Sequence, residues 1–317
     1  MKKAKSSLEH SPGKLPHAVQ QPPGLADRTI SVLTYIIFIC FAFACTYPFY
    51  YVFINTISSN KLSDRGEVLF YPLEVHFKNY TNAFQMPGLF RAAQVSVART
   101  VIGTAFTVLF AAFIGFMCTR QHLWKRKLWY RFVVITMYFN AGVIPWYLTM
   151  KNLGLTNNFW GYIFPSMVSP FFIILSKTYI ESTPRELQES AEIEGAGILT
   201  TFFRIIMPVS RPILATIAIF AAVGQWNAFQ DTLLLVTNNR LYTLQFVLFQ
   251  YLNQASSLAG ILNSSGGSGV EAIVGNIQTA TSVRMTVTII VVAPILLVYP
   301  MFQRFFVKGI MIGAVKG

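Results

Sequence analysis

Five glutamates lie close together in a chain that otherwise has few acidic side chains. They make up five of its twelve Asp and Glu residues, and they are Glu181, Glu186, Glu189, Glu192 and Glu194. Carboxylates at this spacing can present negative charge to a partner. They can equally keep one face of an amphipathic loop in water while its apolar face lies on lipid headgroups. Composition alone leaves both interpretations open.

A second group of polar side chains falls inside an apolar run. Gln225, Trp226 and Asn227 are consecutive, and Gln230 and Asp231 follow closely. Asn and Gln carry both hydrogen-bond donors and acceptors, which suits sugar hydroxyl groups, and an indole can stack on the apolar side of a sugar ring. Polar side chains in a bilayer also join helices to one another. We favour a substrate pathway for Gln225, Trp226 and Asn227 over such packing.

Two further polar features lie in apolar runs. Tyr138, Asn140 and Trp146 form a polar–aromatic patch. Tyr138 and Asn140 are candidate pathway residues, although packing or anchoring at the membrane interface is the stronger explanation for the patch. Arg99 could line a pathway or extend its side chain towards the interface, and the sequence does not decide between these roles.

The chain lacks the phosphate-binding loop GxxxxGK[ST]. Its Gly13-Lys14 pair has no upstream glycine, so ATP must bind elsewhere. Proton-coupled carriers usually hold ionisable residues near the bilayer midplane, and no central Glu, Asp or His relay is visible here. Cys40, Cys45 and Cys118 fall in apolar runs without metal-ligand spacing. We expect no catalytic residue, no metal site and no cofactor bound by this chain.

Composition places these residues in a membrane protein. Of the 317 residues 54% are hydrophobic and 12% are charged, and the mean hydropathy is +0.50. Soluble domains carry about 25% charged residues, and a membrane-spanning helix needs about 20 mostly apolar ones. The sequence predicts an all-α protein with six transmembrane helices, near residues 28–58, 92–118, 128–150, 158–180, 212–236 and 285–307.

The charge distribution predicts how these spans are oriented. The net charge of +13 is spread through the loops between the apolar runs, which argues against nucleic-acid binding. The side that carries the larger share of Lys and Arg faces the cytoplasm by the positive-inside rule, and both termini lie on it. We expect residues 1–28 to be a disordered cytoplasmic tail, since they are polar and rich in Pro, Gly, Ser and Lys.

Residues 182–211 join the fourth and fifth runs with more chain than a connector needs. Thr183 to Glu186 has the form of a capping box, with Pro at the first helical position, and predicts a helix to about Glu194. Gly195 would end that helix in a left-handed conformation, and the apolar stretch 198–207 would form a second short helix. The residues expected to anchor this elbow to its bundle are Ile193, Ile198, Phe202, Phe203 and Ile206.

The elbow resembles the EAA loop of ABC importer permeases. That pattern is Glu-Ala-Ala, three residues, Gly, nine residues, Ile, one residue and Leu-Pro, and every spacing is kept here. The departures are Ser190 for Ala and Met207 for Leu. The span count, the run 219–235 and the C-terminal residues 307–317 also resemble the MalG-like carbohydrate permeases, and among them the LplC/YtcP group.

The resemblance implies a MetI/MalG-like permease domain over residues 29–317, with a cytoplasmic coupling loop at 182–211 between helices 4 and 5. The loop residues it assigns to coupling with an ATPase are Glu189, Ser190, Ala191, Glu194, Gly195, Ala196, Ile205, Met207 and Pro208. ATP and Mg would be bound by that partner.

The resemblance also implies the other partners and the location. These are a second homologous permease, a dimer of cytoplasmic ATP-binding subunits, an extracytoplasmic solute-binding protein and an oligosaccharide substrate, with the whole assembly at the cell membrane. Transport would proceed by alternating access. An importer of another solute class on the same fold, a proton-coupled carrier and a channel-like protein remain alternatives.

Overall fold

The described part of the chain is helical. The computed structural model describes residues 25–253 and 280–309, and the regular elements within these ranges are helices. The all-α class predicted from the sequence is confirmed there. The chain divides into two compact units, residues 1–50 and 51–317.

The first apolar run forms α1 (Leu25–Thr56). Its segment Asp27–Thr56 has 30 residues and contains an 18-residue window with a mean hydropathy of 2.2, so it is long and apolar enough to cross a bilayer core. The helix begins before the expected end of the tail at residue 28. Residues 1–24 of that tail lie outside the described residues.

Two short helices follow α1 in the polar–aromatic segment after it. They are α2 (Asn60–Asp64) and α3 (Lys78–Gln85). The Asn55 amide donates to the Val68 carbonyl at 3.3 Å and accepts from the Ser63 hydroxyl at 2.6 Å. These bonds fix the segment to residues 51–56 at the end of α1.

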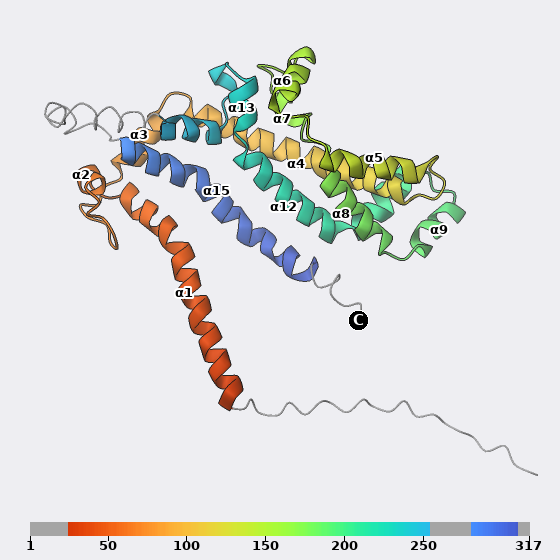
Figure 1. Ribbon diagram of the computed structural model, residues 1–317, viewed down its shortest axis with the longest axis horizontal. Coiled ribbons are helices and arrows are strands. Elements are labelled where there is room, and N and C mark those ends of the chain that lie inside the picture. Colours follow the sequence, from red (N-terminus) through yellow and green to blue (C-terminus); the bar gives the residue numbers. More distant parts are fainter. Residues whose placement is uncertain (1–24, 254–279, 310–317) are drawn as a thin grey trace, which may run out of the picture. The chain divides into compact units, whose positions relative to one another are not determined.

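Three helices form the centre of residues 51–317. They are α4 (Leu89–Thr119), α8 (Pro170–Glu181) and α12 (Arg211–Asn227), and α4 packs against both of the others (Figure 1). A Cβ built on Gly115 would lie 3.0 Å from the Cβ of Ser176. Glycine at this position therefore lets α4 and α8 approach closely.

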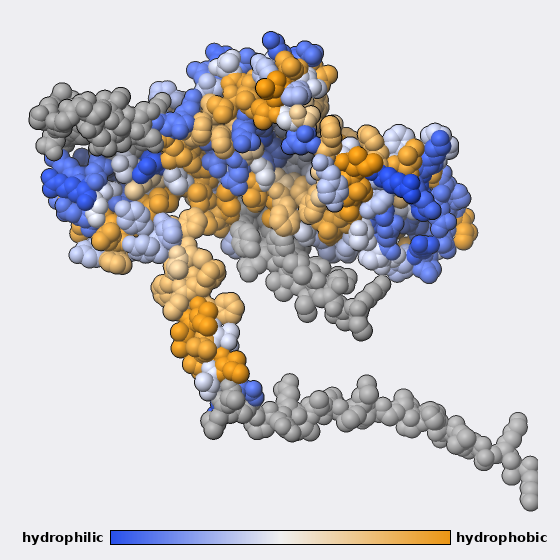
Figure 2. Space-filling view, viewed as in Figure 1, coloured by the Kyte–Doolittle hydropathy of each residue, from blue (hydrophilic) through white to orange (hydrophobic). Residues whose placement is uncertain are grey.

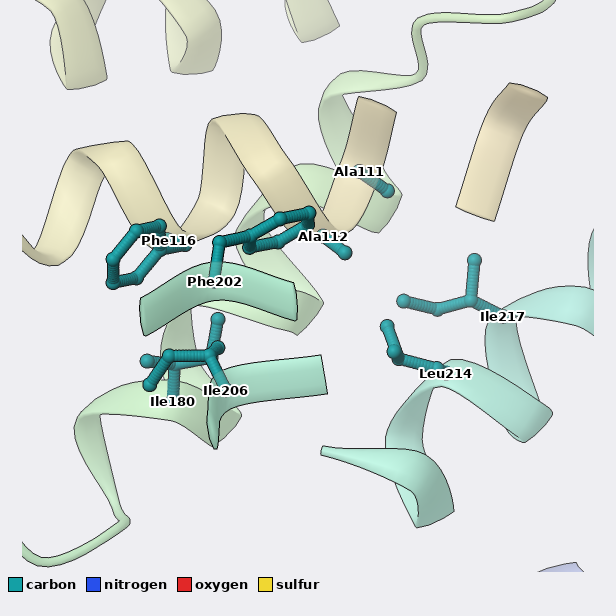
Figure 3. Close-up of a cluster of buried hydrophobic side chains, with 8 residues drawn as sticks. All are labelled: Ala111, Ala112, Phe116, Ile180, Phe202, Ile206, Leu214 and Ile217. Carbon is teal, nitrogen blue, oxygen red and sulfur yellow. The ribbon is translucent and has the colours of Figure 1, made fainter. Parts of the chain in front are cut away.

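An apolar cluster joins these helices to the elbow (Figure 3). Its buried members are Ala111, Ala112, Phe116, Ile180, Phe202, Ile206, Leu214 and Ile217. The ring of Phe202 is central to the cluster, since its centroid lies 5.2 Å from that of Phe113 and 5.8 Å from that of Phe116. The cluster therefore ties the second half of the elbow to α4.

The third to fifth expected spans are interrupted. α5 (Arg126–Tyr138) and α6 (Val143–Asn152) meet at 118°, where Gly142 has φ +87°. α7 (Trp160–Ile163) is separated from α8 by a segment with a proline, and α8 itself begins at a proline. Proline lacks the N–H that continues a helix, and glycine permits a left-handed turn, so both residue types account for the breaks.

The fifth expected span also has a gap. α12 ends at Asn227 and α13 (Gln230–Leu235) begins after two non-helical residues, Ala228 and Phe229. η2 (Asn239–Leu241) and a helix over residues 244–253 follow. The last expected span falls within α15 (Ala280–Gly309), which packs beside α12 (Figure 1).

Within the described residues, two helices are long and apolar enough to cross a membrane, Asp27–Thr56 and Leu89–Thr119. The number rises to four if each of two bent pairs counts as one span, and these pairs are α5 with α6, and residues 198–209 with α12. The expected count of six spans is not confirmed in this part of the chain.

Candidate functional site

The elbow has two halves joined at a glycine. Its first half is α9 (Glu186–Ile193), and Gly195 follows with φ +74°. The Gly195 N–H donates to the Glu192 carbonyl at 3.0 Å, and the Ala196 N–H donates to the Ala191 carbonyl at 2.9 Å. This pair of bonds is a Schellman cap, which needs a left-handed residue at the position of Gly195. The predicted glycine stop is confirmed.

The start of α9 differs from the prediction. The Thr183 hydroxyl donates to the Ile180 carbonyl at 2.6 Å, and so it caps the end of α8. α9 begins at Glu186, and Arg185 before it makes no side-chain cap bond. The predicted capping box is therefore wrong, because α9 begins at Glu186 and the residue at its cap position is Arg185, not Thr183.

The second half of the elbow is one short helical segment with a wider turn inside it. α10 (Ile198–Thr201) leads into a π-helical turn, η1 (Phe202–Ile206), and then α11 (Met207–Val209). Phe202 and Ile206 are buried in the apolar cluster, so these two expected anchors are confirmed. The other three, Ile193, Ile198 and Phe203, are exposed, and Ile193 reaches 87%. They do not anchor the elbow to residues that the structure describes.

The candidate coupling residues differ in burial. Ala191 is buried, whereas the exposed members are Glu189, Ser190, Glu194, Gly195 and Pro208 and the half-buried ones are Ala196, Ile205 and Met207. Beside them an open pocket of about 240 Å³ lies between α9 and the end of α4. Arg120, which lines this pocket, forms an ion pair with Glu192. Hydrophilic residues gather around α9 in Figure 2.

A second candidate site centres on Arg99, which lies about 15 Å along α4 from Leu89. Its side chain is 2% exposed and pairs with Asp231 at the start of α13. Nη1 donates to Asp231 Oδ1 at 3.0 Å and to the Ala228 carbonyl at 3.2 Å, and Nε donates to Gln225 Oε1 at 2.9 Å. A buried charge is stable when it is paired and hydrogen-bonded in this way.

The network around Arg99 extends to α7. The Gln225 amide donates from Nε2 to the Ser166 hydroxyl at 2.7 Å, and that hydroxyl donates to the Tyr162 carbonyl at 3.0 Å. The Arg99 guanidinium lies over the Tyr162 ring, 4.7 Å from its centroid. A Cβ on Gly103 would lie 2.7 Å from Gln225 Cδ, so glycine there makes room for the amide.

An open pocket of about 490 Å³ borders this network. We call it the polar pocket, and its polar and aromatic lining residues include Asn140, Trp146, Asn227, Phe229, Gln230 and Asp231. Amide and carboxylate groups with aromatic rings can bind a polyhydroxylated molecule through hydrogen bonds and stacking. The structure thus brings two candidates from separate runs, Asn140 and Asn227, into one pocket.

Three other pathway candidates lie elsewhere. Gln225 is 6% exposed and engaged with Arg99 and Ser166. Trp226 is half-buried, and its Nε1 donates to the Val291 carbonyl of α15 at 3.0 Å. Tyr138 is 82% exposed and does not line the polar pocket. Their contact with substrate stays a prediction.

Arg99 and Asp231 stand out in the sequence as separate charges in apolar runs, and their pairing was not predicted. A signal for the pair was present, since opposite charges in apolar runs are costly unless they meet. Trp146, Gln230 and Asp231 also line the polar pocket, although they were not predicted as site residues from the sequence.

Comparison with known proteins defines the class of protein to which this fold and site belong. The family described as binding-protein-dependent transport system inner membrane component matches residues 107–312, and the chain belongs to that family. It is a permease subunit of an ABC importer, a membrane protein that works with ATPase and solute-binding partners. The resemblance inferred from the elbow is confirmed.

Individual relatives cover most of the chain. Protein LplC of Bacillus subtilis (strain 168) is 33% identical over 270 residues, which are 85% of this chain and 89% of LplC. The polygalacturonan/rhamnogalacturonan transport system permease protein YtcP of the same organism is 30% identical over 293 residues, which are 92% of this chain and 100% of YtcP.

A solved structure shows the same fold. It is the crystal structure of a bacterial ABC transporter involved in the import of the acidic polysaccharide alginate. The matched chain has a TM-score of 0.79 and 25% sequence identity, over 89% of this chain and 98% of that one. The MetI-type permease fold expected from the sequence is confirmed.

Proposed function

We propose that this chain is one of two membrane-spanning halves of an ATP-driven importer for oligosaccharides, and that it works by alternating access. The observation that carries the substrate class is the polar pocket, where Asn140, Asn227 and Gln230 surround an opening beside Trp146. The names of relatives agree with it, since YtcP is named for polygalacturonan and rhamnogalacturonan and AraQ of Halalkalibacterium halodurans for arabinooligosaccharides.

The elbow supports the coupling part of the proposal. Its second half is fixed by Phe202 and Ile206, while Ile193 and Leu187 of α9 are exposed next to the glutamates. An exposed apolar and acidic helix on a fixed support is suited to bind a second subunit. In this proposal the elbow faces the cytoplasm with both termini, and the ATPase partner binds ATP and Mg.

Uptake by the reconstituted complex tests this function. The complete importer, with its partner permease, ATPase and binding protein, would be placed in vesicles and offered trigalacturonate, arabinotriose or raffinose. We expect uptake of at least one sugar that requires both ATP and the binding protein. Uptake driven by a proton gradient without ATP would contradict the proposal.

The role of the polar pocket is tested by Asn227→Ala. Loss of one neutral hydrogen bond should raise the KM for uptake by about fivefold, with little change in the amount of assembled complex. Asn152→Ala on α6 is the matched control, because Asn152 is exposed and outside the pocket lining. An equal effect of both variants on KM would remove the pocket from the pathway.

A further inference from the structure

The gap between α12 and α13 is held by a side chain from another helix. Ala228 and Phe229 are not helical. The Ala228 N–H still donates to the Gly224 carbonyl and the Phe229 carbonyl accepts from the Leu233 N–H, so the helical bonds break between these two residues and the break is open to contacts from other elements. Arg99 of α4 supplies them, since its guanidinium contacts the last turn of α12 at Gln225, the gap at Ala228 and the first turn of α13 at Asp231. The buried Arg99 side chain thus bonds to the helix before the gap, to the gap itself and to the helix after it.

The same interruption forms one wall of the polar pocket. The lining residues Asn227, Ala228, Phe229, Gln230 and Asp231 are consecutive. Arg99 is almost fully buried behind this wall, whereas Asp231 is 17% exposed and reaches the pocket. Arg99 therefore acts on the pocket through the residues that it holds.

We propose that Arg99 is a positioning residue that holds the α12–α13 interruption in the shape needed by the polar pocket, with Asp231 as its charge partner. Arg99 supplies several donors in a fixed fork, and Lys would supply one point charge with different geometry. The part of this inference that concerns sugar uptake rests on the proposed function, and the part that concerns the helix interruption does not.

Cysteine labelling tests the positioning without any substrate. Thr232, fully buried on α13, would be replaced by Cys in the assembled complex, with Cys40 and Cys45 replaced by Ser and the buried Cys118 kept. A water-soluble maleimide should label Cys at 232 at least about tenfold faster in Arg99→Met, because several charge-assisted hydrogen bonds to the interruption are lost.

Two internal controls accompany this experiment. Arg91→Met removes another arginine from α4, an exposed one that donates to the Arg240 carbonyl, and should leave Cys at 232 protected. Cys118 reports on the fold as a whole and should stay protected in Arg99→Met. If Cys118 is also labelled in Arg99→Met, the milder variant Arg99→Lys is used instead. It should speed labelling at residue 232 and leave Cys118 protected. Unchanged protection at 232 overturns the inference.

A double-mutant cycle tests the pairing with Asp231 in transport. The probe is the sugar of the uptake panel that the unmodified complex takes up best. Arg99→Met leaves the Asp231 carboxylate without its cation and should raise KM by more than about tenfold, since breaking a buried ion pair is costly. Adding Asp231→Asn removes the stranded charge, so the double variant should be less impaired than Arg99→Met alone.

The outcomes separate the two proposals. If no sugar is taken up by the unmodified complex but labelling at 232 responds to Arg99→Met, the proposed function fails and the positioning inference stands. Asp231→Asn alone completes the cycle. If its loss and that of Arg99→Met multiply in the double variant, Arg99 and Asp231 act independently and the pairing is overturned.

Discussion

Two arginine–carboxylate pairs, one within α4 and one just after its end, differ in how firmly they are held. Arg99 and Asp231 are 2% and 17% exposed, and Arg99 has further bonds to Gln225 and Ala228. Arg120 and Glu192 are 13% and 38% exposed, and they border the open pocket beside α9. A buried, multiply bonded pair fixes the parts that it joins more firmly than a pair whose carboxylate is exposed to water.

The elbow shows the same contrast on a smaller scale. Phe202 and Ile206 fix its second half in the apolar cluster, whereas α9 has one buried residue, Ala191, and an ion pair from the exposed Glu192 to Arg120. Gly195 separates the two halves. The structure therefore distinguishes a fixed part of the molecule, around Arg99 and Phe202, from a part that can change position at lower cost.

The largest effect is expected from Gly195→Leu. A leucine at φ +74° is strained by about 1–2 kcal/mol, and relief of that strain would redirect α9. We expect ATP-dependent uptake to fall to background while the protein still inserts into the membrane, as measured by uptake and immunoblotting of the vesicles. Gly197→Leu is the control, because Gly197 has φ −68° and no atom within 4 Å of its Cβ position. Normal uptake by Gly195→Leu would remove the coupling role of the bend.

A smaller effect on uptake is expected from Gly103→Ala, which disturbs the buried network around Arg99. The added methyl would overlap the Gln225 amide, which is held in place by hydrogen bonds to Arg99 and Ser166. Uptake should fall by about tenfold, which is the cost of one displaced buried hydrogen bond or two. Gly224→Ala on α12 has open space at its Cβ and should be tolerated. Equal uptake by both variants would mean that the network accommodates the methyl.

The smallest effect is expected from Glu192→Gln. An exposed ion pair contributes up to about 1 kcal/mol, so uptake should change by less than about fivefold. Added salt should reduce the difference between the variant and the unmodified protein, because screening weakens the original pair. A loss as large as that of Gly103→Ala would contradict the contrast between the two arginines.

Local features of the fold were predictable from the sequence. Gly195 ends α9 because its conformation suits glycine, and the helix at 285–307 follows from an apolar run. The bends in the third to fifth runs were harder to place, since proline and glycine mark where a helix can break without fixing the angle. Arg99 and Asp231 are 132 residues apart, and their pairing depends on how α4, α12 and α13 pack.

The elbow anchors show the same limit. A helical pattern cannot show which apolar residues face the bundle when a π-helical turn changes the angular spacing, as at Phe202–Ile206. Phe202 and Phe203 are adjacent in sequence, yet one is buried and the other is exposed.

The space left by Gly103 makes two positions dependent on each other. The amide of Gln225 occupies the volume that a side chain on α4 would otherwise fill. A larger side chain at residue 103 therefore requires a shorter one at residue 225. Homologues that keep an amide at 225 should keep glycine at 103. Substitutions at residues 103 and 225 should therefore occur together.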